Sequence, residues 1–159
     1  MITSVPRAGG GYDLRLFGAD KLHEGWTEHP ASPVLENDRQ FARSAGRVTL
    51  TDGRIFRFAQ GSIPHYGSDV RLLEITELSE AHYRERVVRQ VPLLCAGEDA
   101  WRTGGMHHID LHRGERNSWF ACVDGWRANQ VHLSNLRWTL QFPPPKLGPG
   151  DISKKFSIV

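Results

Sequence analysis

Polar side chains that could bind a ligand are densest in residues 105–112, which carry the sequence GMHHIDLH. Successive side chains of a β-strand point to opposite faces, so in a strand His108, Asp110 and His112 share one face. Imidazole and carboxylate groups can together hold Zn²⁺ or Mn²⁺, but the spacing differs from that of the helical HExxH motif. No metal ion or other cofactor is predicted, and these three residues remain only alternative metal ligands. His107 and His108 are predicted to contact a ligand or, alternatively, to hydrogen-bond strand ends.

A second group of candidate residues lies at the loop over residues 61–68, GSIPHYGS. Glycine near each end and a proline inside favour an irregular backbone, and loops of this kind often carry binding residues. Gln60, His65 and Tyr66 could hydrogen-bond a sugar and stack on it. The alternative is that the loop only connects two structural units.

A β-hairpin is predicted immediately before this loop. Asp52-Gly53 is the two-residue signal of a type I′ turn and lies between the apolar-rich runs 48–51 and 54–58. The turn predicts three cross-strand pairs, listed by residue: Thr51 with Arg54, Leu50 with Ile55, and Thr49 with Phe56. Residues 70–75 are expected to supply a third strand.

The remaining elements are also predicted to be short strands. Residues 12–17 form one strand, and residues 107–111 pair with residues 118–123. Residues 83–88 favour an edge strand because they carry charges of both signs. A helix over residues 77–89 is the alternative, since Ser79 could cap it. About seven short strands at this spacing are typical of sandwiches, barrels and propellers, with large aromatics such as Trp101, Trp119 and Trp126 expected in the core.

The composition argues against several classes of protein. The 159 residues are 39% hydrophobic and 24% charged, with a net charge of +2. This charge is too small to predict nucleic-acid binding. No segment approaches the roughly 20 apolar residues of a membrane span, and the first residues lack a signal-peptide core. A cytoplasmic location is therefore expected, and Cys95 and Cys122 are expected to be free thiols rather than a disulfide.

Several short motifs occur in a characteristic order: LFGAD at 16–20, GWTEHP at 25–30, ARSAGR at 42–47, YG at 66–67, GGMHHID at 104–110 and VDG at 123–125. Together they resemble the five-bladed β-propeller domain that lies N-terminal to the glycosyltransferase in glucosamine inositolphosphorylceramide transferases. The same order resembles, more distantly, the five-bladed glycoside hydrolases that act on arabinan, xylan and fructan.

The resemblance implies an all-β fold of antiparallel four-stranded blades over residues 12–127. A blade takes about 40–45 residues, so this stretch supplies two to three of the five blades. Residues 1–11 are expected to be a flexible N-terminus and residues 128–159 an irregular Pro-rich tail. A partial, truncated propeller would leave blade edges open, which predicts self-association.

The resemblance also implies a function in carbohydrate recognition. The expected role is a carbohydrate- or glycolipid-binding accessory module of a glycosyltransferase-like protein, with a glycan or glycolipid as partner. Arg43, just before an inner strand, would then point to the propeller axis. Its guanidinium suits carboxylate, phosphate or sugar hydroxyl groups, although a surface salt bridge is the alternative.

A glycoside hydrolase-like enzyme is the alternative function, and an inactive fragment is another. Propeller hydrolases cleave with two carboxyl groups at the axis. Asp110, at the start of an inner strand, is the candidate catalytic residue. Asp20, Asp69 and Asp124 are ranked below it because Asp is common beside turns. The sequence offers no convincing Glu as a general acid.

Overall fold

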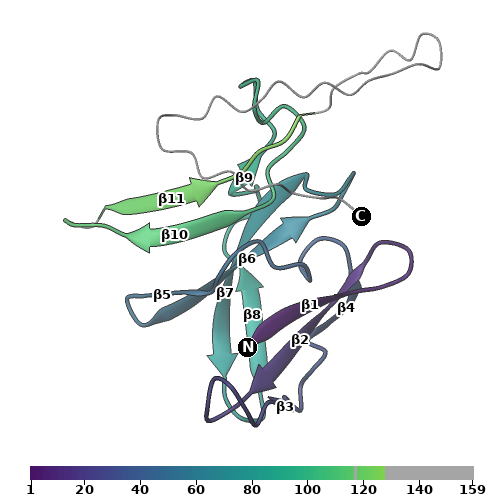
Figure 1. Ribbon diagram of the computed structural model, residues 1–159, viewed down its shortest axis with the longest axis vertical. Helices are drawn as coiled ribbons and strands as arrows, with labels where there is room; N and C mark the ends of the chain where they lie inside the picture. The colour runs from purple at the N-terminus through teal and green to yellow at the C-terminus, as the bar shows by residue number, and fades with distance from the viewer. Residues whose placement is uncertain (117, 128–159) are drawn as a thin grey trace, which may run out of the picture. The chain divides into compact units, whose positions relative to one another are not determined.

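The computed structural model describes residues 1–116 and 118–127, which form eleven β-strands (Figure 1). Within these ranges there is no helix, and therefore none long and apolar enough to cross a membrane. Every strand pairing is antiparallel. The all-β prediction is confirmed for the described residues. The predicted tail at 128–159 lies outside the described residues.

The central sheet follows chain order: β5 (Thr49–Thr51), β6 (Arg54–Gly61), β7 (Asp69–Leu78) and β8 (Tyr83–Val87), with β9 (Leu94–Cys95) beside the start of β7. The three predicted hairpin pairs are confirmed residue by residue. Asp52 and Gly53 have φ angles of 50° and 73°, as a type I′ turn requires. Because β8 is a strand, the helical alternative for residues 77–89 is wrong.

An N-terminal sheet forms around β2 (Tyr12–Gly18), which pairs with β1 (Ile2–Pro6), β3 (Thr27–Glu28) and β4 (Leu35–Asp38). Residues 1–11 are expected to be flexible, yet β1 pairs with β2 over five residues. β1 is held by backbone hydrogen bonds to β2. Because these bonds do not depend on side-chain type, the side-chain pattern of residues 1–11 did not predict the strand.

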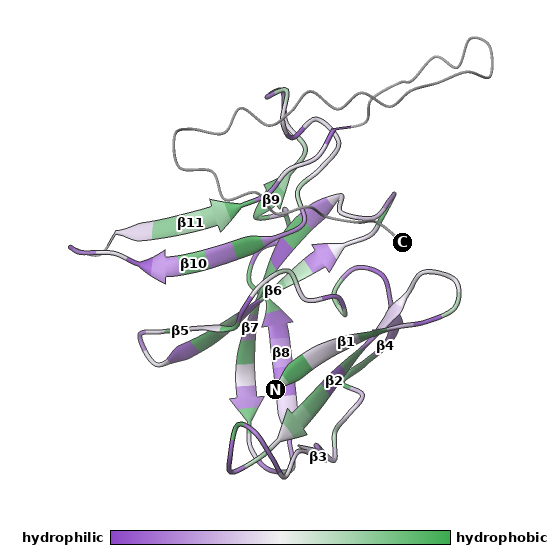
Figure 2. Cartoon of the chain, viewed as in Figure 1, coloured by the Kyte–Doolittle hydropathy of each residue, from purple (hydrophilic) through white to green (hydrophobic). Residues whose placement is uncertain are grey.

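The third sheet is a hairpin of β10 (Ile109–Arg113) and β11 (Trp119–Val123). Figure 2 shows that the end of β10 is hydrophilic, whereas much of β11 is hydrophobic. The main core cluster consists of Ala45, Phe58, Val70 and Ile109 and so joins this hairpin to the central sheet. Trp101 and Trp119 are 49% and 41% exposed, so the expectation that they lie in the core is wrong. Aliphatic side chains, among them Leu72, Leu93, Leu94, Leu111 and Val123, surround the cluster instead.

The segment 42–45 is the seam that holds the three sheets together. The Ser4 hydroxyl of β1 donates to the Ala42 carbonyl at 2.9 Å. The Ala45 N–H donates to the Phe58 carbonyl of β6 at 2.9 Å, and the Ala45 carbonyl accepts the Ile109 N–H of β10 at 2.8 Å. Arg43 therefore extends from a backbone that is fixed on several sides.

Candidate functional site

Arg43 lies at the centre of the candidate site. Its Nε donates to Gln60 Oε1 at 3.0 Å, and its Nη2 donates to the Tyr66 hydroxyl at 2.8 Å. The guanidinium carbon lies 4.8 Å from the ring centroid of Tyr12 and 4.9 Å from that of Tyr66. Both distances are within the range of a cation–π interaction. The structure thus brings Arg43 together with Gln60 and Tyr66, which the sequence predicts as a separate group, and adds Tyr12.

Gly67 and Gly105 fix the position of the loop that carries Tyr66. The Trp126 indole N–H donates to the Gly67 carbonyl at 3.0 Å. A β-carbon on Gly105 would stand 2.1 Å from that carbonyl oxygen, so only glycine permits this approach. The Tyr66 ring consequently lies edge-on to the His107 ring, with centroids 5.8 Å apart.

Asp124 holds His107 in place. The Asp124 carboxylate contacts His107 Nδ1, and its Oδ1 accepts the backbone N–H groups of His107 at 3.2 Å and His108 at 2.8 Å. From the sequence, Asp124 ranks low as a candidate because it lies beside a turn. Asp124 reaches His107 because the segment around it runs antiparallel to the segment before β10, where Gly105 and Trp126 form an isolated β-bridge.

We call these residues the Arg43 cluster: Tyr12, Arg43, Gln60, Tyr66, His107 and Asp124. The cluster combines a buried amide with an accessible aromatic ring, since Gln60 is 3% exposed and Tyr66 is 50% exposed. Aromatic faces, a guanidinium group and an amide can stack on a sugar ring and hydrogen-bond its substituents. No local sequence signal distinguishes Tyr12, which an apolar–polar pattern would read only as a strand residue.

Two other predicted binding residues lie outside the cluster. His65 Nε2 contacts the Gly104 carbonyl at 3.0 Å, and the His65 ring lies 5.2 Å from a Trp126 ring in an edge-on arrangement. These contacts fasten the loop. His108 is exposed, and it precedes β10 rather than belonging to it. Within the described residues no hydrogen bond joins its side chain to the cluster, and its backbone N–H donates to Asp124 Oδ1.

Asp110 is held by Arg47 and His112. Arg47 Nε lies 2.6 Å from Asp110 Oδ1, and His112 Nε2 lies 2.9 Å from Oδ2. The His112 hydrogen bond, with further help from the charge of Arg47, holds the pKa of Asp110 below its ordinary value. A general acid of a glycosidase needs a raised pKa, and the shift at Asp110 is in the opposite direction.

The alternative metal ligands do not form a ligand set. In the part of the chain that the structure describes, no group of three or more His, Cys, Asp or Glu residues could hold a metal ion. His112 and Asp110 instead contact each other and Arg47.

A comparison with protein families identifies the relatives of this chain. Residues 9–126 match the family described as Glucosamine inositolphosphorylceramide transferase 1, N-terminal. The chain belongs to this family. All six residues of the Arg43 cluster lie within the matched stretch. No solved structure matches the chain with statistical significance.

Two plant proteins illustrate the relationship. A protein of Oryza sativa subsp. japonica named Glucosamine inositolphosphorylceramide transferase 1 is 32% identical over 117 residues, covering 72% of this chain and 16% of that protein. An Arabidopsis thaliana protein of the same name is 31% identical over 110 residues, covering 68% of this chain and 14% of that protein. The chain therefore spans less than a fifth of the length of these relatives.

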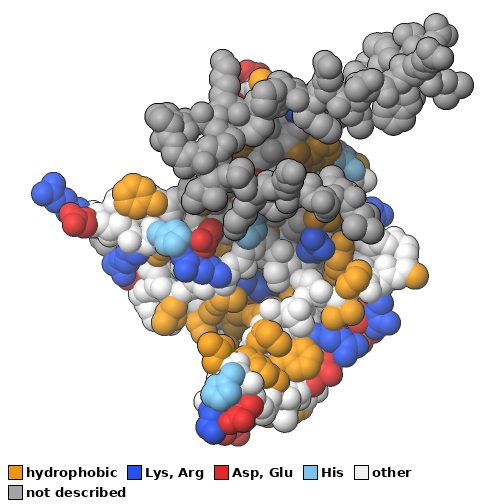
Figure 3. Space-filling model, viewed as in Figure 1, with side chains coloured by type: hydrophobic (Ala, Val, Ile, Leu, Met, Phe, Trp, Pro, Cys, Tyr) orange, Lys and Arg blue, Asp and Glu red, His pale blue; other side chains and the backbone are white. Residues whose placement is uncertain are grey.

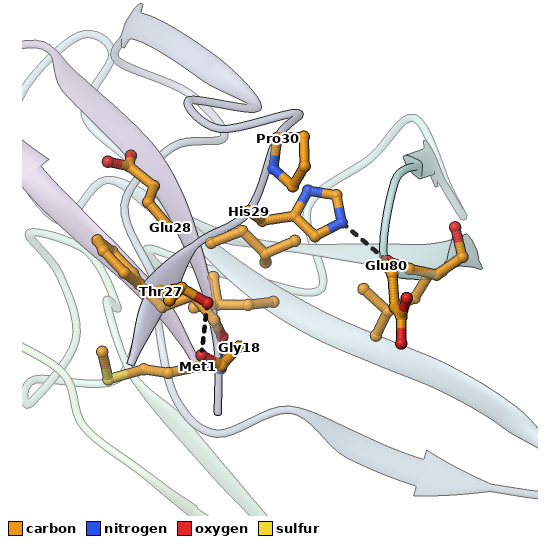
Figure 4. A pocket seen from close by; sticks show the side chains of 12 residues that line it. Met1, Gly18, Thr27, Glu28, His29, Pro30 and Glu80 are labelled. Carbon is orange, nitrogen blue, oxygen red and sulfur yellow. Dashed lines mark hydrogen bonds between the residues drawn. The ribbon is translucent and has the colours of Figure 1, made fainter. Parts of the chain in front are cut away.

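A cavity of about 520 Å³ lies outside the Arg43 cluster. It is lined by the N-terminal sheet and the residues after β3, by Leu78 at the end of β7, and by the two residues that follow β7. His29 Nε2 contacts the Ser79 carbonyl beside the cavity (Figure 4). Figure 3 shows hydrophobic side chains gathered near the N-terminus and charged ones at the tip of the β10–β11 hairpin. None of the residues that the sequence predicts for ligand binding lines this cavity.

Proposed function

We propose that the chain is a carbohydrate- or glycolipid-binding accessory module, built as part of a β-propeller, of a glycosyltransferase-like protein. The family membership supports the link to a glycosyltransferase. The names of the plant relatives support a glycolipid that contains an inositol phosphate group. The four-stranded meander β5-β6-β7-β8 supports the propeller architecture, because a blade is a sheet of four antiparallel strands.

The Arg43 cluster is the observation that carries this proposal. Its donors and rings come from the N-terminal sheet, the seam, the end of β6, the loop over residues 61–68 and the segment before β10. Ligand sites typically bring a few polar groups from several elements to one place. A surface salt bridge, by contrast, needs only two residues. Arg43 also lacks the acidic partner that the salt-bridge alternative requires among the described residues.

Binding of the full chain to a glycan array and to vesicles containing inositolphosphorylceramide tests this function. Tyr66→Ala removes the exposed ring and is expected to weaken binding about tenfold or more. Trp119→Ala is the matched control, because Trp119 is a similarly exposed aromatic residue outside the cluster. Absence of binding to any glycan or vesicle, or equal losses in the two variants, would contradict the proposal.

The glycoside hydrolase-like alternative stays a prediction without a supporting contact. Its candidate residue Asp110 is paired with Arg47 and His112 and has a lowered pKa. Release of reducing sugar from arabinan or xylan by the wild-type chain, and its loss in Asp110→Asn, would favour the hydrolase over the binding module.

A further inference from the structure

Arg43 differs from the arginines of the central sheet in the kind of partner it has. Arg54, Arg57 and Arg71 each contact a carboxylate, on Glu74, Glu85 and Asp69 respectively. Within residues 1–116 and 118–127, the polar partners of the Arg43 guanidinium are an amide oxygen and a phenol hydroxyl, which are both neutral. The positive charge of Arg43 is therefore not neutralised by a neighbouring carboxylate.

The amide of Gln60 adds a donor that has no acceptor. Gln60 is 3% exposed, and Arg43 Nε occupies its Oε1. This hydrogen bond fixes the orientation of the amide, because a guanidinium N–H cannot donate to an amide nitrogen. Gln60 Nε2 has no partner among the described residues, and neither does the buried hydroxyl of Ser62, two residues further on. A buried donor without an acceptor is unfavourable, so Gln60 Nε2 favours a ligand that brings an acceptor oxygen.

Two nearby carboxylates do not compensate this positive site. A β-carbon on Gly61 would stand 2.2 Å from Asp69 Oδ1, so Asp69 lies on the face of β6 opposite to the Gln60 side chain. Arg71 pairs with Asp69 there. Asp124 is occupied by His107 and by two backbone N–H groups.

We propose that Arg43 and Gln60 form an oxyanion subsite, which binds a phosphate or carboxylate group attached to a sugar. A guanidinium group and an amide N–H₂ can donate together to two oxygens of one oxyanion, and charge-assisted hydrogen bonds of this type are the stronger ones. Tyr12 and Tyr66 flank the guanidinium and hold it in position. This inference rests on the proposed function and adds that the preferred ligand is anionic.

Isothermal titration of the full chain with four ligands tests the subsite. The anionic probes are myo-inositol 1-phosphate and methyl glucuronide, and their neutral counterparts are myo-inositol and methyl glucoside. We expect at least one anionic probe to bind about tenfold or more tightly than its neutral counterpart. Preference for the phosphate or for the carboxylate identifies the source of the oxyanion.

Gln60→Glu is the decisive variant because it is nearly isosteric and places an internal carboxylate against Arg43. We expect it to remain folded and to lose the preference for the anionic probe. Arg43→Gln removes the charge directly and gives a second test should Gln60→Glu not fold. Arg89→Gln, at an exposed arginine after β8, is the matched charge control and should bind like the wild type.

The outcomes separate this inference from the proposed function. Equal binding of charged and neutral probes, with Tyr66→Ala still weakening both, overturns the subsite and leaves sugar binding intact. Anion binding that survives both Gln60→Glu and Arg43→Gln also overturns it. Absence of binding to all four probes and to every glycan and vesicle overturns both.

Discussion

Arg57 of β6 and Glu85 of β8 form a bidentate ion pair, and Arg57 is only 2% exposed. The remaining Nη1 of Arg57 donates to the Phe41 carbonyl at 2.8 Å, and the Tyr83 hydroxyl donates to Glu85 at 2.6 Å. Burial, followed by the charge of Glu85, raises the pKa of Tyr83 well above its ordinary value of 10.0. The pair thus crosses the sheet and connects β8 to the segment before the seam.

Removal of one partner of this pair should be more costly than removal of both. Glu85→Leu leaves the Arg57 charge buried and unpaired, and is expected to lower the free energy of unfolding by about 3–5 kcal/mol. The double variant Arg57→Met/Glu85→Leu should lose clearly less, because no buried charge remains. Urea unfolding measures both. A double variant as unstable as Glu85→Leu alone would contradict this account.

Gly105→Ala should displace the loop that carries Tyr66. The new methyl group would collide with the Gly67 carbonyl, and the φ angle of 152° at position 105 disfavours alanine. A destabilisation of at least about 2 kcal/mol is expected, together with a change in the tryptophan fluorescence of the chain. Gly18→Ala is the control, since nothing lies within 4 Å of a β-carbon there. If both variants unfold at the same urea concentration, the tight approach at Gly105 has no energetic role.

Glu74 should make the stability of the central sheet depend on pH in the acidic range. Hydrogen bonds from Arg54 and Arg86 lower its pKa from 4.5 to about 2. The folded state therefore binds this proton more weakly than the unfolded chain does. The stabilisation is complete above about pH 4.5 and is lost as the pH falls towards 2.

Comparison of the wild type with Glu74→Gln isolates this effect from that of Asp13, whose pKa is also lowered to about 2. The difference in thermal stability between the two proteins should be largest at pH 6 and should shrink as the pH approaches 2.5. A difference that stays constant over this range would show that Glu74 does not titrate as described.

Asp124 and Asp110 should respond differently to the same chemical change. Asp124→Asn weakens the contact that orients His107 against Tyr66, so binding of the anionic probe should fall several-fold. Asp110→Asn breaks contacts with Arg47 and His112 outside the cluster, so binding should remain as in the wild type. Titrations at constant pH measure both. Equal losses, or a loss confined to Asp110→Asn, would place the ligand elsewhere.

Local patterns sufficed to predict the central hairpin. Asp52-Gly53 specifies a turn whose register follows from the two flanking residues alone, because cross-strand pairing counts outward from the turn. The alternating charges of β8 likewise agree with an edge strand. By contrast, β1 has no distinctive local signal, since its place depends on backbone groups of β2.

Sequence alone therefore determined that the part of the chain described by the structure is all-β and that a hairpin forms at Asp52-Gly53. It also made Arg43, Gln60 and Tyr66 candidate binding residues. Only the tertiary structure decided that these three side chains meet, that Tyr12 and Asp124 join them, and that Asp110 pairs with Arg47 instead. The reason is physical. Strand alternation assigns each side chain to a face of its sheet, and this follows from local sequence. Contact between segments some 20 to 60 residues apart requires in addition the seam at 42–45 and the close approach of Gly105 to Gly67.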